Sequence, residues 1–254
     1  MSSAKIAALY RHPVKGLSPE EIDEALLEEN GHFPCDRLFA IENGPSGFDP
    51  TAPAHQPKFK FLMLMRNERL ARLTTRYEEA SGLLMMEQNG KIAAQGNLHD
   101  DTGRDAITHF LETYLADDMR GPAKILTAEG YRFMDSKSGF VSILNLASVA
   151  DIATRIGRPY LDPLRFRANI HAKGWEPWAE NTLVGARLKI GEAELEVIKR
   201  IERCAATDVD PKIGIRDVRM VEALERLYQH HDCGIYAKIT RRGTIRPGDD
   251  IRVF

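Results

Sequence analysis

Cysteine is scarce in this sequence of 254 residues, which contains only Cys35, Cys204 and Cys233. An odd, scattered set of three cysteines argues against a disulfide framework and for a reducing compartment. The same set cannot supply the four thiolates of an ordinary iron–sulfur cluster. If the protein moves electrons, a separate protein must therefore deliver them.

Long apolar runs and a strong charge of either sign are absent as well. No stretch approaches the roughly 20 apolar residues of a membrane span, and the opening MSSAKIAALYRHPVKG lacks the apolar core of a signal peptide. The formal net charge is -2, so the overall charge points neither to nucleic acid nor to a membrane as a partner. With 43% hydrophobic and 28% charged residues the chain is typical of a globular protein, and we expect it to be cytoplasmic.

The first part of the chain predicts short strands. Residues 6–10 and 36–41 are strand candidates, and residues 44–57 are rich in glycine and proline, which predicts a loop. Residues 83–87 and 91–95 flank Asn89-Gly90, a strong type I′ hairpin signal because both positions tolerate positive φ. The pattern predicts an antiparallel meander.

Helical periodicity follows this meander. Apolar residues at positions 107, 110, 111 and 114 share one helical face, and Thr102 with Asp105 resembles a capping box at the start of that helix. Two more helical stripes cover residues 149–156 and 220–228, and strands are expected at 188–190, 194–201, 235–240 and 250–254. The sequence therefore predicts a mainly β protein with a few covering helices, of α+β or barrel-like architecture.

The segment RIERCAATDVDP, residues 200–211, places Arg203 directly before Cys204. If the preceding strand continues in register, Arg203 points toward the core, where a lone guanidinium is costly. A bulge or strand end near residue 203, or a buried anionic ligand, would resolve this conflict. The charge of Arg203 favours the thiolate form of Cys204, which suits a nucleophile or a ligand of a soft metal. Alternatively, Cys204 is a buried cysteine that acts as a small hydrophobic residue.

Two other segments carry cations that suit anion binding. In RFRAN, residues 165–169, two arginines flank a phenylalanine, and a guanidinium matches the geometry of phosphate oxygens. Lys15 lies in a turn after the first strand candidate. For RFRAN the alternative is a solvated charge pair, and Asp36-Arg37, which follows Lys15 further along the chain, could equally be a surface ion pair.

The run His230-His231-Asp232-Cys233 contains residue types that bind zinc. Adjacent histidines point apart on regular structure, and the second ligand pair of a structural zinc site is missing. We therefore interpret this run as the end of the third helix, followed by a turn at Gly234.

Taken together and in order, five segments resemble the MOSC family, named after the C-terminal part of molybdenum cofactor sulfurase. They are YRHPVKG, CDRLFAI, RFRANI, ERCAATDVDPKIG and CGIYAKITRRGTIRPGDDIRV. The N-terminal half is similar to the β-barrel domain that often precedes a MOSC domain. The resemblance implies a MOSC-type β-barrel with covering helices at residues 119–254, preceded by a barrel-like β domain at residues 1–118.

The resemblance also implies a cofactor and an activity. The cofactor is the molybdenum cofactor, a molybdopterin that bears a phosphate, and family members of the amidoxime-reducing type use it to reduce N-hydroxylated compounds. Cys204 would be the catalytic residue and metal ligand of such an oxidoreductase. Its substrate would be a small molecule, and its electrons would come from a separate iron–sulfur or flavin protein. The residues implied to hold the pterin and its phosphate are Lys15, Arg37, Ser142, Arg167, Asn169, Arg203 and Thr207.

Two departures from the family pattern keep other hypotheses open. Relatives often carry serine where this chain has Gly16, and proline where it has Ala168. A carrier of sulfur, as a persulfide on Cys204, or of the cofactor without redox turnover is the main alternative. A degenerate member that binds nothing is a further one.

Overall fold

Strand β1 (Ala4–Arg11) follows the apolar pattern that begins the chain, and Ala4, Ile6 and Leu9 are buried. The computed structural model, which describes residues 4–136 and 141–254, places β1 in a large sheet formed mostly by the second half of the chain. The strand order is β10 (Ile170–Lys173), β9 (Val141–Asn145), β13 (Asp232–Arg241), β12 (Ala193–Glu202), β11 (Arg187–Ile190), β15 (Asp250–Val253), β1 and β2 (Glu20–Ile22).

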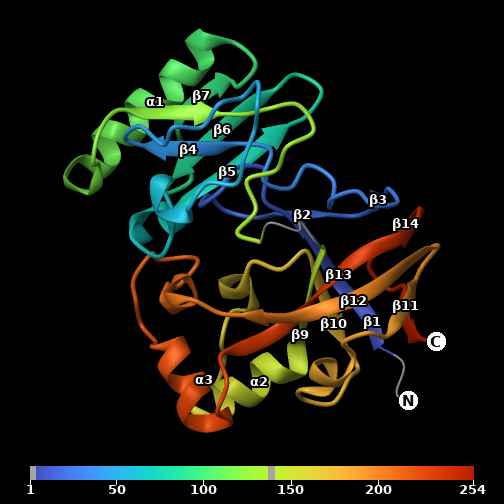
Figure 1. The fold of residues 1–254 in the computed structure, drawn as a ribbon. Coiled ribbons are helices and arrows are strands. Elements are labelled where there is room, and N and C mark those ends of the chain that lie inside the picture. The colour runs from blue at the N-terminus through green and yellow to red at the C-terminus, as the bar shows by residue number, and fades with distance from the viewer. Residues whose placement is uncertain (1–3, 137–140) are drawn as a thin grey trace.

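This sheet closes on itself. Strand β1 pairs with both β15 and β10, so seven strands form a barrel and β2 extends it at β1 (Figure 1). The barrel is filled by apolar side chains at alternate positions, including Leu195 and Val197 of β12, as the period-two pattern predicts. The expected mainly β fold with barrel architecture is confirmed.

A second lobe lies above the barrel in Figure 1. Strands β5 (Leu73–Glu78), β6 (Leu83–Gln88) and β7 (Lys91–Asn97) form an antiparallel sheet, and α1 (Asp101–Leu115) packs on it. The predicted hairpin is confirmed, because Asn89 and Gly90 join β6 to β7 with φ of 52° and 73°. Two-stranded pairs of β4 (Ala40–Asn43) with β8 (Ala123–Leu126), and of β3 (Ala25–Leu27) with β14 (Gly243–Ile245), complete the sheets among the described residues.

Two further helices, α2 (Leu146–Arg155) and α3 (Met220–Tyr228), cover the barrel at the end away from α1 (Figure 1). Both were expected from periodicity. Helix α3 ends at Tyr228 and strand β13 begins at Asp232. The run of residues 230–233 therefore leads from a helix into a strand. Among the described residues no group of three or more His, Cys, Asp or Glu could hold a metal ion.

Three local predictions are wrong. Helix α1 is capped by Asp100, whose carboxylate accepts from the backbone N of Gly103 at 2.6 Å, and not by a box of Thr102 and Asp105, because the helix begins at Asp101. Only Ala40 and Ile41 of the predicted strand 36–41 are in a strand, because Arg37 adopts φ of 51°, outside the β region. Gly234 lies inside β13 rather than in a turn.

The two sheet systems do not divide the chain at a single point. Strands β1 and β3 precede the upper lobe in sequence, yet they pair with strands of the C-terminal half, and β2 joins the same sheet through β1. The expected boundary between two domains at residues 118 and 119 therefore stays a prediction. Within the described part of the chain, no helix combines the length and apolar character needed to cross a membrane.

Candidate functional site: a cationic cleft beside Cys204

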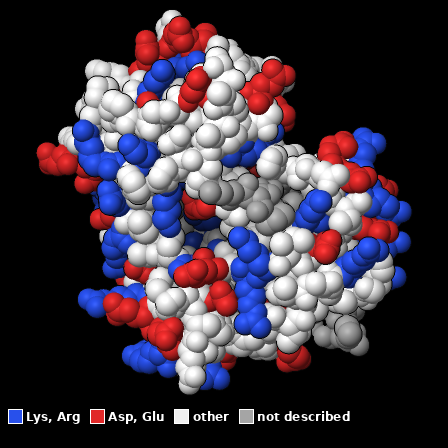
Figure 2. Space-filling view, viewed as in Figure 1, with Lys and Arg blue, Asp and Glu red and all other residues white. Residues whose placement is uncertain are grey.

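A cleft lies between the two lobes. Figure 2 shows a hollow in this face, with lysine and arginine side chains on both sides of it. The wider part contains about 770 Å³ of empty space, some of it open to solvent, and a narrower part adjoins it. The residues that line both parts are Arg37, Lys58, Asp135, Arg167, Cys204 and Ala206.

Cys204 enters the cleft where strand β12 ends. The strand ends at Glu202, and the pairing with β13 shifts register between Arg200 and Glu202, as the expected conflict at residue 203 required. Cys204 is half-buried and extended, and a 3₁₀ turn (Ala205–Asp208) follows it. The hydroxyl and backbone N of Thr207 donate to the carbonyl of Cys204 at 2.8 and 3.0 Å. These bonds fix the backbone and leave the thiol facing the cleft.

Arg203 does not enter the apolar core. Its Nε donates to the carbonyl of Cys233 at 2.7 Å, its Nη1 donates to the carbonyl of Phe166 at 2.8 Å, and its guanidinium lies 5.2 Å from the centre of the Phe166 ring. Nη2 is buried and has no hydrogen-bond partner among the described residues. Burial lowers the pKa of Arg203, so an anion at Nη2 would be favourable.

Gly234 makes room for this guanidinium. A Cβ at Gly234 would lie 3.1 Å from Nη2 of Arg203 and 2.6 Å from the carbonyl oxygen of Ile143, and φ is 86°. The position therefore requires glycine.

The two arginines of RFRAN have different environments. Both terminal nitrogens of Arg165 are engaged, since Nη1 donates to the carbonyl of Asp208 at 3.1 Å and Nη2 lies 3.0 Å from Asp210 and 2.7 Å from Asp217. Its Nε is buried without a hydrogen-bond partner among the described residues. Arg167 donates from Nη1 to the carbonyl of Leu17 at 2.7 Å, but its Nη2 is buried without a hydrogen-bond partner in the described part of the chain. Burial, and then the charge of Arg37, lower the pKa of Arg167. Of this pair, only Arg167 therefore offers a terminal guanidinium nitrogen without a partner among the described residues.

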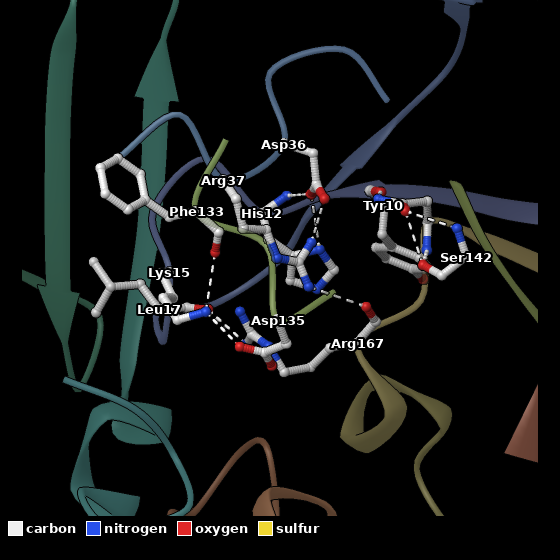
Figure 3. Close-up of polar contacts among 11 residues, drawn as sticks. Tyr10, His12, Lys15, Leu17, Asp36, Arg37, Phe133, Asp135, Ser142 and Arg167 are labelled. Carbon is white, nitrogen blue, oxygen red and sulfur yellow. Dashed lines mark hydrogen bonds and ion pairs between the residues drawn. The ribbon is translucent and has the colours of Figure 1, made fainter. Parts of the chain in front are cut away.

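A buried carboxylate, that of Asp36, supports Arg37. The carboxylate of Asp36 forms an ion pair with Arg37 and accepts from the backbone N of His12 at 2.7 Å (Figure 3). Burial alone would raise the pKa of Asp36, but Arg37 and His12 hold it well below its usual range. Nη2 of Arg37 donates to the backbone carbonyl of Arg167 at 3.3 Å, which joins the two residues (Figure 3).

Lys15 reaches the cleft from the turn after β1. Its Nζ donates to the carbonyl of Phe133 at 2.9 Å and lies 2.5 Å from the carboxylate of Asp135 (Figure 3). Burial lowers the pKa of Lys15, whereas the charge of Lys15 brings the pKa of Asp135 down to about 2 although burial opposes this. The next residue, Gly16, has φ of 84°, and a Cβ there would lie 2.8 Å from the carbonyl oxygen of Leu62.

Ser142 and Asn169 bind each other. The hydroxyl of Ser142 donates to Oδ1 of Asn169 at 2.8 Å and accepts from the backbone N of Asn169 at 3.0 Å. Nδ2 of Asn169 donates to the carbonyl of Tyr10 at 3.2 Å. The pair thus joins β9 to the ends of β1 and β10. Ser142 also lines the cleft, whereas Asn169 is not among the described lining residues.

The structure brings together most of the residues implied by the family resemblance. Those that line the cleft are Lys15, Arg37, Ser142, Arg167, Arg203, Cys204 and Thr207. The sequence interpretation missed Lys58, Asp135 and Tyr236, which also line it. Lys58 follows the Gly/Pro-rich loop, and no periodic pattern marks it or Asp135. Tyr236 could have been found, because it alternates with the buried Ile235 and Ala237 on β13.

Comparison with known proteins identifies the family. The model of the MOSC domain matches residues 130–252, and the model of the MOSC N-terminal beta barrel domain matches residues 3–120. The chain belongs to the MOSC domain family. Mitochondrial amidoxime-reducing component 1 of Mus musculus is 32% identical to this MOSC protein over 287 residues, which cover 97% of the chain and 81% of that protein.

Other MOSC relatives match over shorter regions. A molybdenum cofactor sulfurase of Caenorhabditis briggsae is 32% identical over 174 residues, which cover 65% of this chain and 23% of the sulfurase. The chain thus spans about a quarter of the length of that relative. The YUAD protein of Bacillus subtilis has a crystal structure with a TM-score of 0.46 and 16% identity, covering 100% of this chain and 98% of that one.

Proposed function

We propose that this MOSC protein binds a molybdenum cofactor in the cleft and reduces small N-hydroxylated compounds with electrons from a separate protein. One observation carries the proposal. The thiol of Cys204 opens into the same cleft as two buried guanidinium nitrogens, Nη2 of Arg167 and of Arg203, that have no partner among the described residues. Buried cationic donors without partners are costly, and an anionic ligand would offset that cost.

The donor set fits the two chemical parts of the cofactor. A phosphate needs converging cations, and Lys15, Arg37 and Arg167 approach one another at one end of the cleft. Each charge-assisted hydrogen bond to it would contribute roughly 1.5–3 kcal/mol. A cysteine thiolate suits a metal that already carries soft dithiolene sulfurs. Arg203, Ser142 and Thr207 line the wider part of the cleft, which Cys204 also lines, and would hold the pterin.

When bound, the cofactor supplies two-electron redox chemistry at a molybdenum centre. The substrate takes up two electrons and two protons, its N–O bond breaks, and an amine or amidine and water leave. The protein would contribute the thiolate of Cys204 as a ligand and the cations that orient the pterin. An iron–sulfur or flavin protein would deliver the electrons, because three cysteines cannot hold an ordinary cluster. The relatives named amidoxime-reducing component support this choice of substrate.

Expression in a host that makes the cofactor tests the proposal. Metal and pterin contents would be measured for the wild type, Cys204→Ala and Cys204→Ser, together with reduction of an amidoxime by a chemical or flavoprotein electron donor. We expect near-stoichiometric molybdenum and turnover in the wild type, and loss of both in Cys204→Ala with pterin partly retained. Loaded protein that reduces no N-hydroxylated compound would refute the assigned reaction.

The relatives named molybdenum cofactor sulfurase support a second candidate, a sulfur carrier. The thiolate of Cys204 would attack the outer sulfur of a donor persulfide, accept that sulfur, and release the donor thiolate. Mass spectrometry after incubation with a persulfide donor would detect one added sulfur on Cys204. Its absence under every donor condition would remove this candidate.

A further inference from the structure

The residues on both sides of Cys204 are held by one short segment, residues 165–167, which we name the RFR strip. Before the cysteine, Nη1 of Arg203 donates to the carbonyl of Phe166 at 2.8 Å. After the cysteine, Nη1 of Arg165 donates to the carbonyl of Asp208 at 3.1 Å. The RFR strip therefore fixes the chain one residue before the thiol and four residues after it.

Arg165 makes the second of these attachments rigid. Its side chain is 2% exposed and forms ion pairs with Asp210 and Asp217 at 3.0 and 2.7 Å. The loop that it holds, residues 205–217, is itself closed, because the backbone N of Asp210 donates to the carbonyl of Ile215 at 2.8 Å. The backbone N of Asp217 donates to Asp208 at 3.2 Å. A displacement of the RFR strip would therefore carry the loop with it.

The RFR strip ends in the cation that faces the cleft. Arg167 has a buried Nη2 without a partner among the described residues, and its carbonyl accepts from Arg37, the neighbouring cation. An anion bound at Arg167 and Arg37 would therefore contact the RFR strip, the same three residues that hold the chain around Cys204. Arg165 lies in a 3₁₀ turn and Arg167 caps that turn, so only a short segment separates the anion site from the residue that holds the loop after Cys204.

We propose that Arg165 is a positioning residue that couples occupancy of the anion site at Arg167 to the position and reactivity of the Cys204 thiol. The inference rests on the proposed function only for the natural anion, the cofactor phosphate. For that function, binding of the cofactor phosphate would help to position the thiolate of Cys204 as a metal ligand. The coupling itself exists in the ligand-free protein and can be measured with pyrophosphate.

Thiol reactivity provides the readout. A chromogenic aryl disulfide is attacked by a protein thiolate and releases one coloured aryl thiolate. Cys35 and Cys233 are 4% and 0% exposed, so the fast reaction reports Cys204, and Cys204→Ser defines the background. The rate is measured with and without saturating pyrophosphate, whose affinity for each variant is measured separately by calorimetry.

The informative variant is Asp210→Asn. It preserves the shape of the side chain and its acceptor for the backbone N of Lys212, but it removes the charge that pairs with Arg165. We expect pyrophosphate to change the wild-type rate at least about fivefold, the lower end of typical coupling. In Asp210→Asn the two rates should become nearly equal while pyrophosphate still binds. Arg165→Lys, with one point of attachment in place of a fork, should give an intermediate ratio.

Arg158→Met is the matched control. Arg158 pairs with the same Asp217 at 2.5 Å, but it lies in the segment after α2 and does not belong to the RFR strip. The wild-type ratio should therefore persist. A wild-type thiol reaction rate that is unchanged by bound pyrophosphate overturns the coupling. It is also overturned if Asp210→Asn and Arg165→Lys both keep the wild-type ratio of the rates with and without pyrophosphate. Failure of wild-type protein to bind pyrophosphate also overturns it. If pyrophosphate changes the thiol reaction rate but protein purified from a cofactor-producing host contains no molybdenum, the coupling holds and only the proposed function is contradicted.

Discussion

Arg165 is buried and Arg167 is half-buried in the same turn, and the structure predicts opposite consequences for replacing each by methionine. Arg167→Met removes a guanidinium that makes one protein hydrogen bond, to Leu17, and leaves Nη2 unpaired. Because the donor is charged, the bond contributes about 1.5–3 kcal/mol, and removal of a desolvated charge that Arg37 disfavours offsets most of this loss. We therefore expect the free energy of unfolding of the ligand-free protein to stay within about 1 kcal/mol of the wild type.

The affinity for an anion should fall instead. Loss of one charge-assisted hydrogen bond costs about 1.5–3 kcal/mol, which corresponds to a roughly 10- to 150-fold weaker Kd for pyrophosphate. Calorimetric titration measures this Kd, and chemical denaturation measures the free energy of unfolding of the same samples. Molybdenum content after expression in a cofactor-producing host should fall in parallel.

Arg165→Met is the matched comparison, because it leaves the carboxylates of Asp210 and Asp217 without their buried partner. Breaking a buried ion pair from one side costs about 3–5 kcal/mol, so this variant should lose stability. The reasoning would be refuted if Arg167→Met lost as much stability as Arg165→Met, or if it bound pyrophosphate as tightly as the wild type.

Three further outcomes follow from single contacts. Burial, and then the charge of Arg203, lower the pKa of His171 from 6.5 to about 4; the unfolded state therefore binds more protons between these values, and stability falls as the pH falls through this window. His171→Gln should remove up to about 3 kcal/mol of this acid-side loss in denaturation curves from pH 7 to pH 4. Gly16→Ser, although it restores a family-like hydroxyl, should cost about 1–3 kcal/mol of stability without a gain in pyrophosphate affinity, because φ is 84° and Leu62 crowds the Cβ. Ser142→Ala should destabilise by about 1–3 kcal/mol, since Asn169 then loses a buried partner, while the Kd for pyrophosphate stays at the wild-type value.

Local patterns in the sequence predicted the elements whose structure depends on near neighbours. The hairpin at Asn89-Gly90, the three helices and the end of β12 before Cys204 all follow from periodicity, turn chemistry or the cost of burying Arg203. The strand predicted from residue 36 failed because backbone conformation there serves the contacts of Asp36 and Arg37, and not a sheet. No local pattern encodes such contacts.

The site was predictable only where family motifs mark it. Those motifs placed Cys204, Arg167 and Arg37 in one cleft, but they did not distinguish the engaged Arg165 from the available Arg167. That distinction depends on Asp210 and Asp217, which reach Arg165 only through the folded loop. Lys58 and Asp135 join the cleft from segments without periodicity, so the three-dimensional structure was needed to find them.

Closure of the barrel by β1 has a consequence for the order of events in the cell. Residues Ala4 and Lys5 pair with Ile251 and Asp250, so β1 completes its ladder with β15, a strand that is synthesised more than 200 residues later. Pairings this far apart in sequence raise the contact order, and such topologies fold slowly. Lys15 is held beside Asp135 by the turn that follows β1. Synthesis of β15 must therefore precede completion of the barrel, and a ligand that requires the closed barrel can bind only after β15 has been made.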